Sequence, residues 1–169
     1  LIIGLFIFGF ANAQSNSPNL STLGAISIVA SSGAAEGTTW TYANNVIMPN
    51  SATAVTINSS DVLAKLALGN LTIAASGINV NANVNFATNT NGITFKASGN
   101  IVVDAAKTIT TNGGDITLWS DSDNNGAGGI KIDDNATLDS RTQADRTANT
   151  NTTGGGKITL AGGLDDAGV

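Results

Sequence analysis

A triplet made of an apolar residue, a Thr and a second apolar residue recurs along the chain. Its successive copies are 22, 23 and 42 residues apart. A nearly constant period of this length indicates units that stack on their neighbours, because one unit alone cannot bury its apolar side. The chain is therefore restricted to architectures that place equivalent residues above one another. The four copies are Leu71-Thr72-Ile73, Ile93-Thr94-Phe95, Ile116-Thr117-Leu118 and Ile158-Thr159-Leu160.

Two further series of apolar residues keep step with the first. One unit of about 23 residues thus holds three short strands with their corners. In the other direction, a spacing of eight residues runs back from Leu71 to Ile47, so we expect the repeat to begin near Trp40. The second series is Ile78, Ile101 and Ile130, and the third, eight residues later in each unit, is Phe86, Ile109 and Leu138.

The stretch from Ile78 to Phe86 indicates which side chains face inward. Apolar residues alternate with asparagines along it, the pattern of a strand with one buried and one wet face. The sequence therefore predicts an all-β fold, a right-handed parallel β-helix with three short strands per rung of about 23 residues and one short flanking helix. On the outside of the rungs, Thr72, Thr94 and Thr117 should form a column, continued by Thr159.

Two segments depart from the strand pattern. The segment from Ser60 to Gly69 begins with a capping residue, contains helix formers and ends in Gly, so it predicts the flanking helix near the N-terminal end. The segment from Ser140 to Gly156 is polar and lacks apolar alternation, which predicts an exposed, partly mobile loop.

Composition excludes several classes of function. The chain contains no Cys and no His. It therefore has no disulfide framework, and it lacks the commonest general base and transition-metal ligand. The chain has 7 Lys plus Arg against 12 Asp plus Glu, a net charge of −5. Without a basic patch, nucleic acid is not an expected partner.

The chain divides into three predicted parts. Residues 1–13 are an apolar run followed by Ala11 and Ala13 at small-residue cleavage positions, which predicts a secretory signal peptide truncated at its N-terminus. Residues 14–39 are expected to form a leader or cap region. Residues 40–169 are expected to form the β-helix and to continue beyond this sequence.

Three stretches resemble the repeats of filamentous-haemagglutinin-like adhesins, large exported β-helix proteins of Gram-negative bacteria. They are G-N-L-T-I-A-A-S, S-G-N-I-V-V-D-A-A-K-T-I-T-T-N-G-G-D-I-T-L-W-S-D and G-G-G-K-I-T-L-A-G-G, and the similarity covers about residues 40–163. The resemblance implies a secreted or outer-membrane cell-surface location, adhesion to glycans or proteins of host or environmental surfaces, outer-membrane secretion machinery as a partner, and no catalytic residues. Asn16–Leu20, N-S-P-N-L, departs from the N-P-N-G-type export motif of that family.

One candidate site is a possible calcium loop. Asp121, Asp123 and Asn125 occupy positions 1, 3 and 5 of an EF-hand-like pattern, with Gly126 at position 6. Position 12 is Ile132 instead of a bidentate Glu, and no helices are expected on either side. The alternative interpretation is a wide turn between two strands, for which Asp, Asn and Gly are well suited.

A second candidate is a ligand-binding pair on the outer surface. Trp119 should point outward beside Lys96 of the preceding rung, where the two can form a cation–π contact. This pair is interpreted either as a sugar-stacking platform or as structural packing.

The densest cluster of charges leaves an enzymatic alternative open. In polysaccharide lyases built on β-helices, carboxylates bind calcium and a basic residue abstracts the proton, a role for which Arg141 is the candidate here. The alternative is a solvated loop with weak ion pairs. We expect a non-enzymatic adhesin module without a resident cofactor, and a polysaccharide-binding or polysaccharide-degrading protein is the second hypothesis. The cluster consists of Asp133, Asp134, Asp139, Arg141, Asp145 and Arg146.

Overall fold

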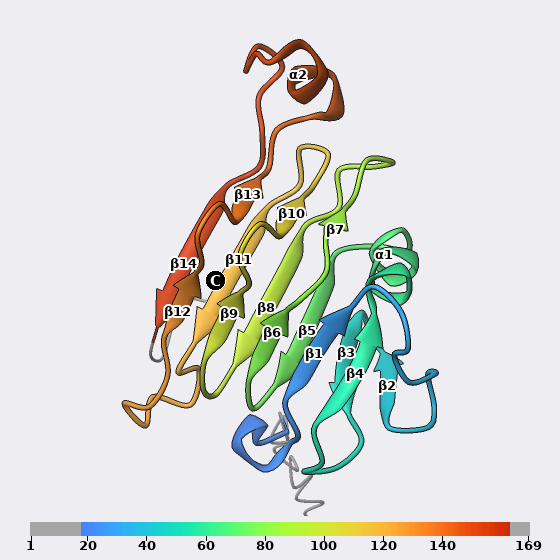
Figure 1. Ribbon diagram of the computed structural model, residues 1–169, viewed down its shortest axis with the longest axis vertical. Coiled ribbons are helices and arrows are strands. Elements are labelled where there is room, and N and C mark those ends of the chain that lie inside the picture. Colours follow the sequence, from blue (N-terminus) through green and yellow to red (C-terminus); the bar gives the residue numbers. More distant parts are fainter. Residues whose placement is uncertain (1–17, 163–169) are drawn as a thin grey trace, which may run out of the picture.

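The computed structural model describes residues 18–162, which form mostly strands in parallel sheets and few helices (Figure 1). The predicted signal peptide at residues 1–13 lies outside the described residues. Two α-helices, α1 (Ser59–Leu66) and α2 (Gln143–Ala148), accompany the strands, together with a short 3-10 helix, η1 (Leu20–Thr22).

The strands form three sheets, which the chain visits in turn. From β5 to β14 it passes repeatedly through the six-stranded, the five-stranded and the three-stranded sheet, in that order. The six-stranded sheet has the order β14 (Ile158–Gly162), β11 (Ile116–Ser120), β8 (Ile93–Ala97), β5 (Leu71–Ala75), β3 (Val46–Pro49) and β2 (Trp40–Ala43). The five-stranded sheet has the order β12 (Ile130–Ile132), β9 (Ile101–Val103), β6 (Ile78–Val80), β1 (Ile26–Val29) and β4 (Val55–Asn58). The three-stranded sheet has the order β13 (Thr137–Asp139), β10 (Thr108–Thr110) and β7 (Val84–Asn85).

The register of the pairs follows the sequence repeat. Leu71 pairs with Ile93, Ile93 with Ile116, and Ile116 with Ile158, so the four triplets lie side by side as predicted. The second series is also in register, since Ile101 pairs with both Ile78 and Ile130.

The predicted register of the third series was wrong by two residues. Ile109 pairs with Leu138 as expected, but on its other side it pairs with Val84 and not with Phe86. A shift of two residues keeps the same side chains on the buried face, so the alternation alone does not distinguish the two registers. Phe86 is still buried, with 4% of its surface exposed.

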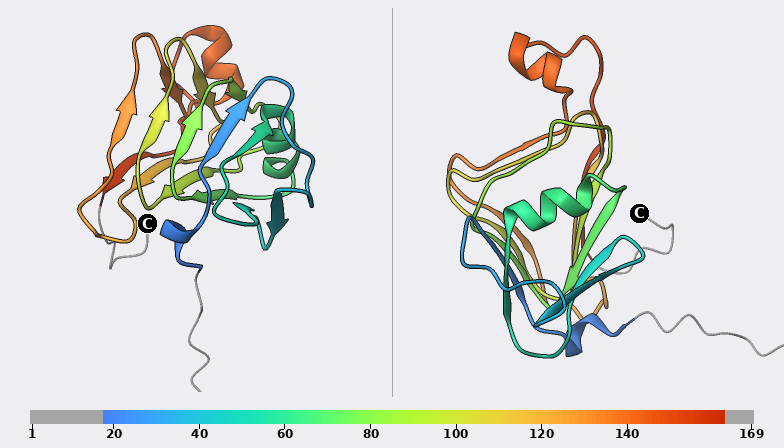
Figure 2. Two further views of the ribbon diagram at one scale, coloured as in Figure 1. Left: turned by 60° about the horizontal axis from the view of Figure 1, so that its bottom comes forward. Right: turned by 90° about the vertical axis from the view of Figure 1, so that its right-hand side faces the viewer.

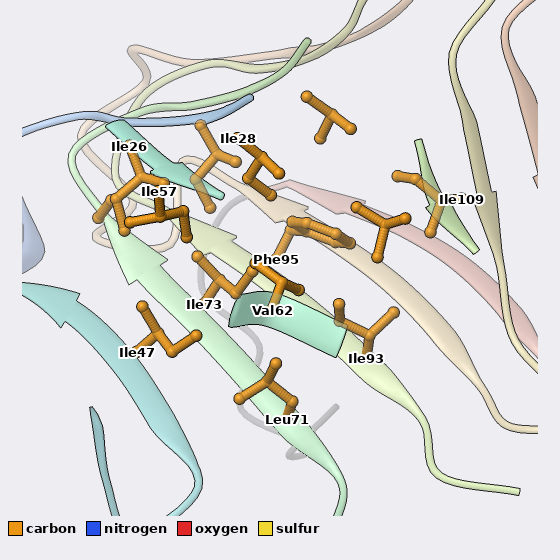
Figure 3. Close-up of a cluster of buried hydrophobic side chains, with 14 of the residues drawn as sticks. Ile26, Ile28, Ile47, Ile57, Val62, Leu71, Ile73, Ile93, Phe95 and Ile109 are labelled. Atoms are coloured by element: carbon orange, nitrogen blue, oxygen red, sulfur yellow. The ribbon is translucent and has the colours of Figure 1, made fainter. Parts of the chain in front are cut away.

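The apolar side chains of the three sheets meet in one core (Figure 3). Phe95 is fully buried in a column between Ile73 and Leu118, which are fully buried as well. Burial of each such side chain contributes about 1.5–3 kcal/mol, and the columns repeat this contribution from strand to strand. Thr117 was expected on the wet side but is only 6% exposed, and it lines a hollow together with Asp115 and Lys157.

Strand β1 was not expected from the repeat. It lies inside the five-stranded sheet, where Ile26 pairs with both Val55 of β4 and Ile78 of β6. The region assigned to a leader or cap therefore supplies a central strand, and the paired strands begin well before residue 40. Figure 2 shows β1, in blue, running beside the strands of later segments.

Helix α1 confirms the helix expected between Ser60 and Gly69. It follows β4 directly, and Asp61 in its first turn and Lys65 in its last turn suit the helix dipole. Val62 and Leu66 are fully buried in the core. On its outer side, the Lys65 Nζ lies 2.6 Å from Glu36 and 4.7 Å from the centre of the Tyr42 ring. The helix therefore helps to close the end of the sheets near β2 and β4.

Helix α2 was not expected within residues 140–156, which the sequence predicted to be an exposed, partly mobile loop. This segment connects β13 with β14 and projects beyond the sheets in Figure 1 and in the right-hand view of Figure 2. We call it the hairpin, because Arg141 and Gly155 pair antiparallel within it. Thr142 caps the helix by accepting a hydrogen bond from Asp145 N, and Asn149 ends it in the left-handed conformation. The sequence signal for this helix is the T-x-x-D capping pattern of Thr142 and Asp145.

Candidate functional site

The outer face of β3, β5, β8, β11 and β14 carries two columns of side chains, and we call it the ladder face. The first column consists of Thr72, Thr94, Thr117 and Thr159, and the second of Ala74, Lys96, Trp119 and Ala161. Both columns follow from the period of the repeat, because equivalent residues of successive segments pair directly. The ladder face therefore brings together the predicted ligand-binding pair and the predicted column of Thr.

The predicted contact between Lys96 and Trp119 is confirmed. The Lys96 Nζ lies 4.0 Å from the centre of the Trp119 ring. Burial lowers the pKa of the Lys96 ammonium from its ordinary value, because a less hydrated cation is less stable. A partly desolvated cation–π pair contributes about 0.5–2 kcal/mol, so the contact holds both side chains in place on the ladder face.

A hollow of about 190 Å³ lies along the column of Thr. Its lining is mixed, with Leu71 and Ile93 beside three Thr hydroxyls, one carboxamide, one carboxylate and one ammonium. Such a lining offers hydroxyl, amide and ionic groups to a ligand that is itself rich in hydroxyls. The residues that line it include Asn70, Thr72, Thr94, Asp115, Thr117 and Lys157.

Hydrogen bonds from backbone N–H groups to side-chain oxygens join residues that line this hollow. Asn70 Oδ1 accepts a hydrogen bond from Gly92 N at 2.8 Å, and Asp115 Oδ1 accepts one from Lys157 N at 2.6 Å. Asn70 and Gly92 directly precede the paired strands β5 and β8, and Asp115 and Lys157 directly precede the paired strands β11 and β14. A Cβ added at Gly92 would lie only 3.0 Å from Asp115 O, so glycine lets the neighbouring segment approach closely. The sequence showed these residues before each triplet, but not that they border a hollow.

A second hollow of about 180 Å³ lies on the same face and is more apolar. Lys96 borders it, so this residue connects the apolar hollow with the Trp119 contact. The other residues that line it include Pro18, Leu20, Val46, Met48 and Ala74.

The Asp121–Gly126 segment forms a tight turn after β11. Asp121 Oδ1 accepts hydrogen bonds from Asn125 N and Gly126 N at 3.0 and 3.1 Å, and Asp123 Oδ2 accepts one from the Asn125 side-chain amide at 3.0 Å. Asp123 Oδ1 is buried and has no hydrogen-bond partner among the described residues. Two of the carboxylate oxygens that a calcium ion would need are thus occupied by the turn itself.

The projecting hairpin is organised around the carboxylate of Asp145, which is only 1% exposed. Its oxygens accept hydrogen bonds from Thr150, Thr152 and Thr153. These donors hold the pKa of the Asp145 carboxyl far below its ordinary value, because they stabilise the charged form. The hairpin therefore has its own network of side-chain hydrogen bonds, which the sequence did not predict.

Both arginines of the charge cluster have partners in the hairpin. Arg141 donates from Nε to Asp139 Oδ1 at 3.0 Å and from Nη2 to Asp139 Oδ2 at 2.7 Å. This pairing holds the pKa of the Arg141 guanidinium above its ordinary value, the opposite of what a proton-abstracting base requires. Arg146 Nη1 donates to the carbonyl oxygens of Thr111 and Arg141, and so ties the hairpin to the sheets.

No family model, curated protein or solved structure matches this chain. Within residues 18–162, neither α-helix has the length and apolar character needed to cross a bilayer. In the same range, no three Asp or Glu side chains come close enough together to hold a metal ion. The functional interpretation therefore depends on the architecture and surface of the chain.

Proposed function

We propose that the chain is a structural and interaction module of an exported, filamentous-haemagglutinin-like adhesin. In this proposal the three sheets form a right-handed parallel β-helix with three short strands per rung, and the helix acts as a stiff stalk. The supporting observation is the register of Leu71, Ile93, Ile116 and Ile158, in which residues one repeat apart pair directly. Backbone pairing between rungs and continuous apolar columns suit a rod, because each rung is stabilised by its neighbours.

The surfaces proposed for adhesion are the ladder face and the Asp145 hairpin. The ladder face offers Trp119, Lys96 and a polar hollow on a rigid sheet. The hairpin projects from the sheets and is held by its own hydrogen bonds, so it presents polar side chains at little cost in ordering. The partners proposed are glycans or proteins of host or environmental surfaces. The proposed location is the cell surface or exterior of a Gram-negative bacterium, reached through outer-membrane secretion machinery.

The stalk is tested by removing one complete rung. Deletion of residues 93–115 joins Gly92 to Ile116, so β11 takes the place of β8 on β5. We expect the shortened chain to keep its strand signal in circular dichroism and to unfold cooperatively. A matched control, deletion of residues 93–103, shifts every later segment into the wrong sheet and should abolish folding. Equal damage from both deletions would contradict the β-helix.

Adhesion is tested with beads that carry the purified chain. The beads are applied to surfaces coated with neutral dextran, with polygalacturonate or with extracellular-matrix protein, and bound beads are counted under flow. We expect adhesion to at least one coating and its reduction by Trp119→Ala. Thr41→Ala, on β2 at the other end of the sheet, is the control and should adhere normally. If no coating retains the beads above an albumin control, the adhesive role is not supported.

The second candidate function is a polysaccharide-binding or polysaccharide-degrading protein. The observation that favours binding is the polar hollow beside Thr72 and Thr94. Degradation by a lyase mechanism has less support, because Arg141 is paired with Asp139. Incubation with pectin-like and alginate-like polymers separates the two activities, since lyase action forms unsaturated products that absorb in the ultraviolet. Binding without such products would support the first alternative alone.

A further inference from the structure

Two further hollows continue the hollow along the column of Thr. The first, which we call the corner hollow, has about 190 Å³ and lies beside the residues that precede β5, β8 and β11. The second, which we call the hairpin hollow, has about 200 Å³ and reaches the projecting hairpin. The corner hollow is lined by Asn70, Thr90, Gly92, Gly113, Gly114 and Asp115. From the hairpin, Thr142, Thr153, Gly154 and Gly155 line the hairpin hollow.

Shared residues join the three hollows into one groove, which we call the long groove. Asn70, Gly92 and Asp115 line both the hollow along the column of Thr and the corner hollow. Thr90 and Gly113 line both the corner hollow and the hairpin hollow. The long groove therefore connects the ladder face with the hairpin, the two surfaces proposed for adhesion.

Thr117 carries a hydroxyl that no other group of the described chain satisfies. This residue is only 6% exposed, and it lines the hollow along the column of Thr. Within residues 18–162 its hydroxyl has no hydrogen-bond partner, whereas the hydroxyls of Thr142 and Thr153 are bonded to Asp145. Polar groups with so little exposure are normally hydrogen-bonded. Thr117 thus places a hydroxyl where a bound ligand can complete its hydrogen bonding.

The size of the hollows suits an extended ligand. Each of the three has about 190 to 200 Å³, less than the about 300–1,000 Å³ of a typical small-molecule pocket. A ligand of ordinary size must therefore extend through more than one hollow, and a linear polymer can follow all three.

The strands below the long groove favour a glycan over a peptide. Extended peptides bind by pairing with a free strand edge or by inserting side chains into apolar pockets. Strands β5, β8 and β11 are each paired on both sides. The apolar side chains that line the groove, Leu71 and Ile93, are only 2% exposed. The groove instead offers hydroxyl, carboxamide and glycine backbone groups, which suit the hydroxyls of sugars.

The charges favour a neutral glycan. Of the described residues that line the long groove, only Asp115 and Lys157 are charged, and their charges are opposite. The whole chain has a net charge of −5, which repels polyanions. A polyanionic glycan would therefore find neither a basic groove nor an attractive field.

We propose that the long groove binds a linear neutral glycan, which runs from the column of Thr, past Thr90 and Gly113, to the hairpin. The Thr117 hydroxyl bonds to a sugar hydroxyl at the ladder-face end. The inference rests on the proposed function, because it takes the glycan partner of the adhesin and assigns its class and its path. Affinity should increase with the length of the glycan until the three hollows are filled.

Titration calorimetry of the full chain with neutral glucans tests the class of ligand. Dextran, laminarin and hydroxyethyl cellulose present three different linkages, and we expect at least one of them to bind. An oligosaccharide of about six units from that glucan should bind about tenfold more tightly than its disaccharide, because it makes more hydrogen bonds. Polygalacturonate, a polyanion, and casein, an unfolded polypeptide, should bind more weakly than the glucan.

Two substitutions test the path of the glycan. Thr90→Trp places a large side chain where the corner hollow meets the hairpin hollow, and it should weaken binding by about tenfold or more. Thr88→Trp is the matched control, because it makes the same change at an exposed Thr of the same segment that does not line the groove, and it should bind as the wild type does.

Thr117→Val removes the hydroxyl but keeps the shape of the side chain, and it should weaken binding by about fivefold, the effect of one hydrogen bond. Thr56→Val on β4 of the five-stranded sheet is its control and should leave binding unchanged. Circular dichroism of each variant shows whether the fold is kept.

The outcomes separate this inference from the proposed function. Binding of a glucan that Thr90→Trp and Thr117→Val leave unchanged would overturn the long groove, while an adhesive role toward glycans would stand. Tighter binding of polygalacturonate or casein than of any glucan would overturn the proposed ligand class. If no glucan binds but the beads adhere to matrix protein, adhesion stands without this site. Failure of both binding and bead adhesion would remove the inference and the proposed function together.

Discussion

The replacement of Phe95 by Ala tests the assignment of inner and outer faces most sharply. Phe95 is fully buried between Ile73 and Leu118 of the two neighbouring strands. Truncation of its side chain to Ala leaves a cavity between these two residues. Phe→Ala changes in a core destabilise a protein by about 3–5 kcal/mol. The neighbouring Thr94 lies on the ladder face of the same strand, so Thr94→Ala should change the free energy of unfolding by no more than about 1 kcal/mol.

Urea unfolding followed by circular dichroism measures both changes. With an m-value of about 2 kcal/mol/M, Phe95→Ala should lower the midpoint by about 2 M and Thr94→Ala by less than about 0.5 M. Tryptophan fluorescence, from the buried Trp40 on β2 and from Trp119 on β11, is the second probe. Coincident transitions by the two probes would show that the loss is global. Similar midpoint shifts for the two variants would refute the assignment of the faces.

Three further predictions concern individual side chains. The pKa of the Asp145 carboxyl is depressed in the folded state. Its contribution to the free energy of unfolding is therefore complete above its unfolded pKa of about 3.9 and is lost as the pH falls below that value. The difference in Tm between the wild type and Asp145→Asn should shrink between about pH 6 and pH 2, and a constant difference would contradict the role of the carboxylate. Lys96→Ala should increase quenching of tryptophan fluorescence by iodide, because the ammonium covers the ring of Trp119, and unchanged quenching would argue against this cover. Calcium at about 1 mM should raise Tm by less than about 2 °C, because Asp121 already accepts hydrogen bonds within its turn. A shift of this size corresponds to a site with a Kd of ~1 mM or weaker. A larger shift that Asp123→Ala abolishes would establish a calcium site.

The repeat predicted the parts of the fold in which a residue and its partner are one period apart. The positions of Leu71, Ile93 and Ile116 follow directly from stacking, and so does the contact between Lys96 and Trp119, which are 23 residues apart. The third series was less well determined. Its strands are short, and a shift by two residues preserves the alternation, so the choice between Val84 and Phe86 depends on the geometry of the corner.

Features without a periodic partner could not be predicted in this way. The I-S-I-V stretch of β1 alternates as a strand does, but its place between β4 and β6 is a matter of long-range topology. The hairpin is stabilised by hydrogen bonds around a single buried carboxylate, Asp145, and not by apolar residues. The hollow on the ladder face depends on how Asp115 and Lys157 stand relative to Thr117, which residue spacing does not determine.

The most direct test of the stacked rungs is a distance between two spin labels on one column of the five-stranded sheet. Thr56 and Lys131 lie on its first and last strands, with Ser27, Asn79 and Val102 in register between them. Four strand spacings of about 4.8 Å predict about 19 Å between the labelled backbone positions, measured by pulsed dipolar spectroscopy on the double-cysteine variant. Deletion of residues 93–115 should shorten this distance by one spacing, about 5 Å. A distance above about 35 Å, or one that the deletion leaves unchanged, would contradict the stacking.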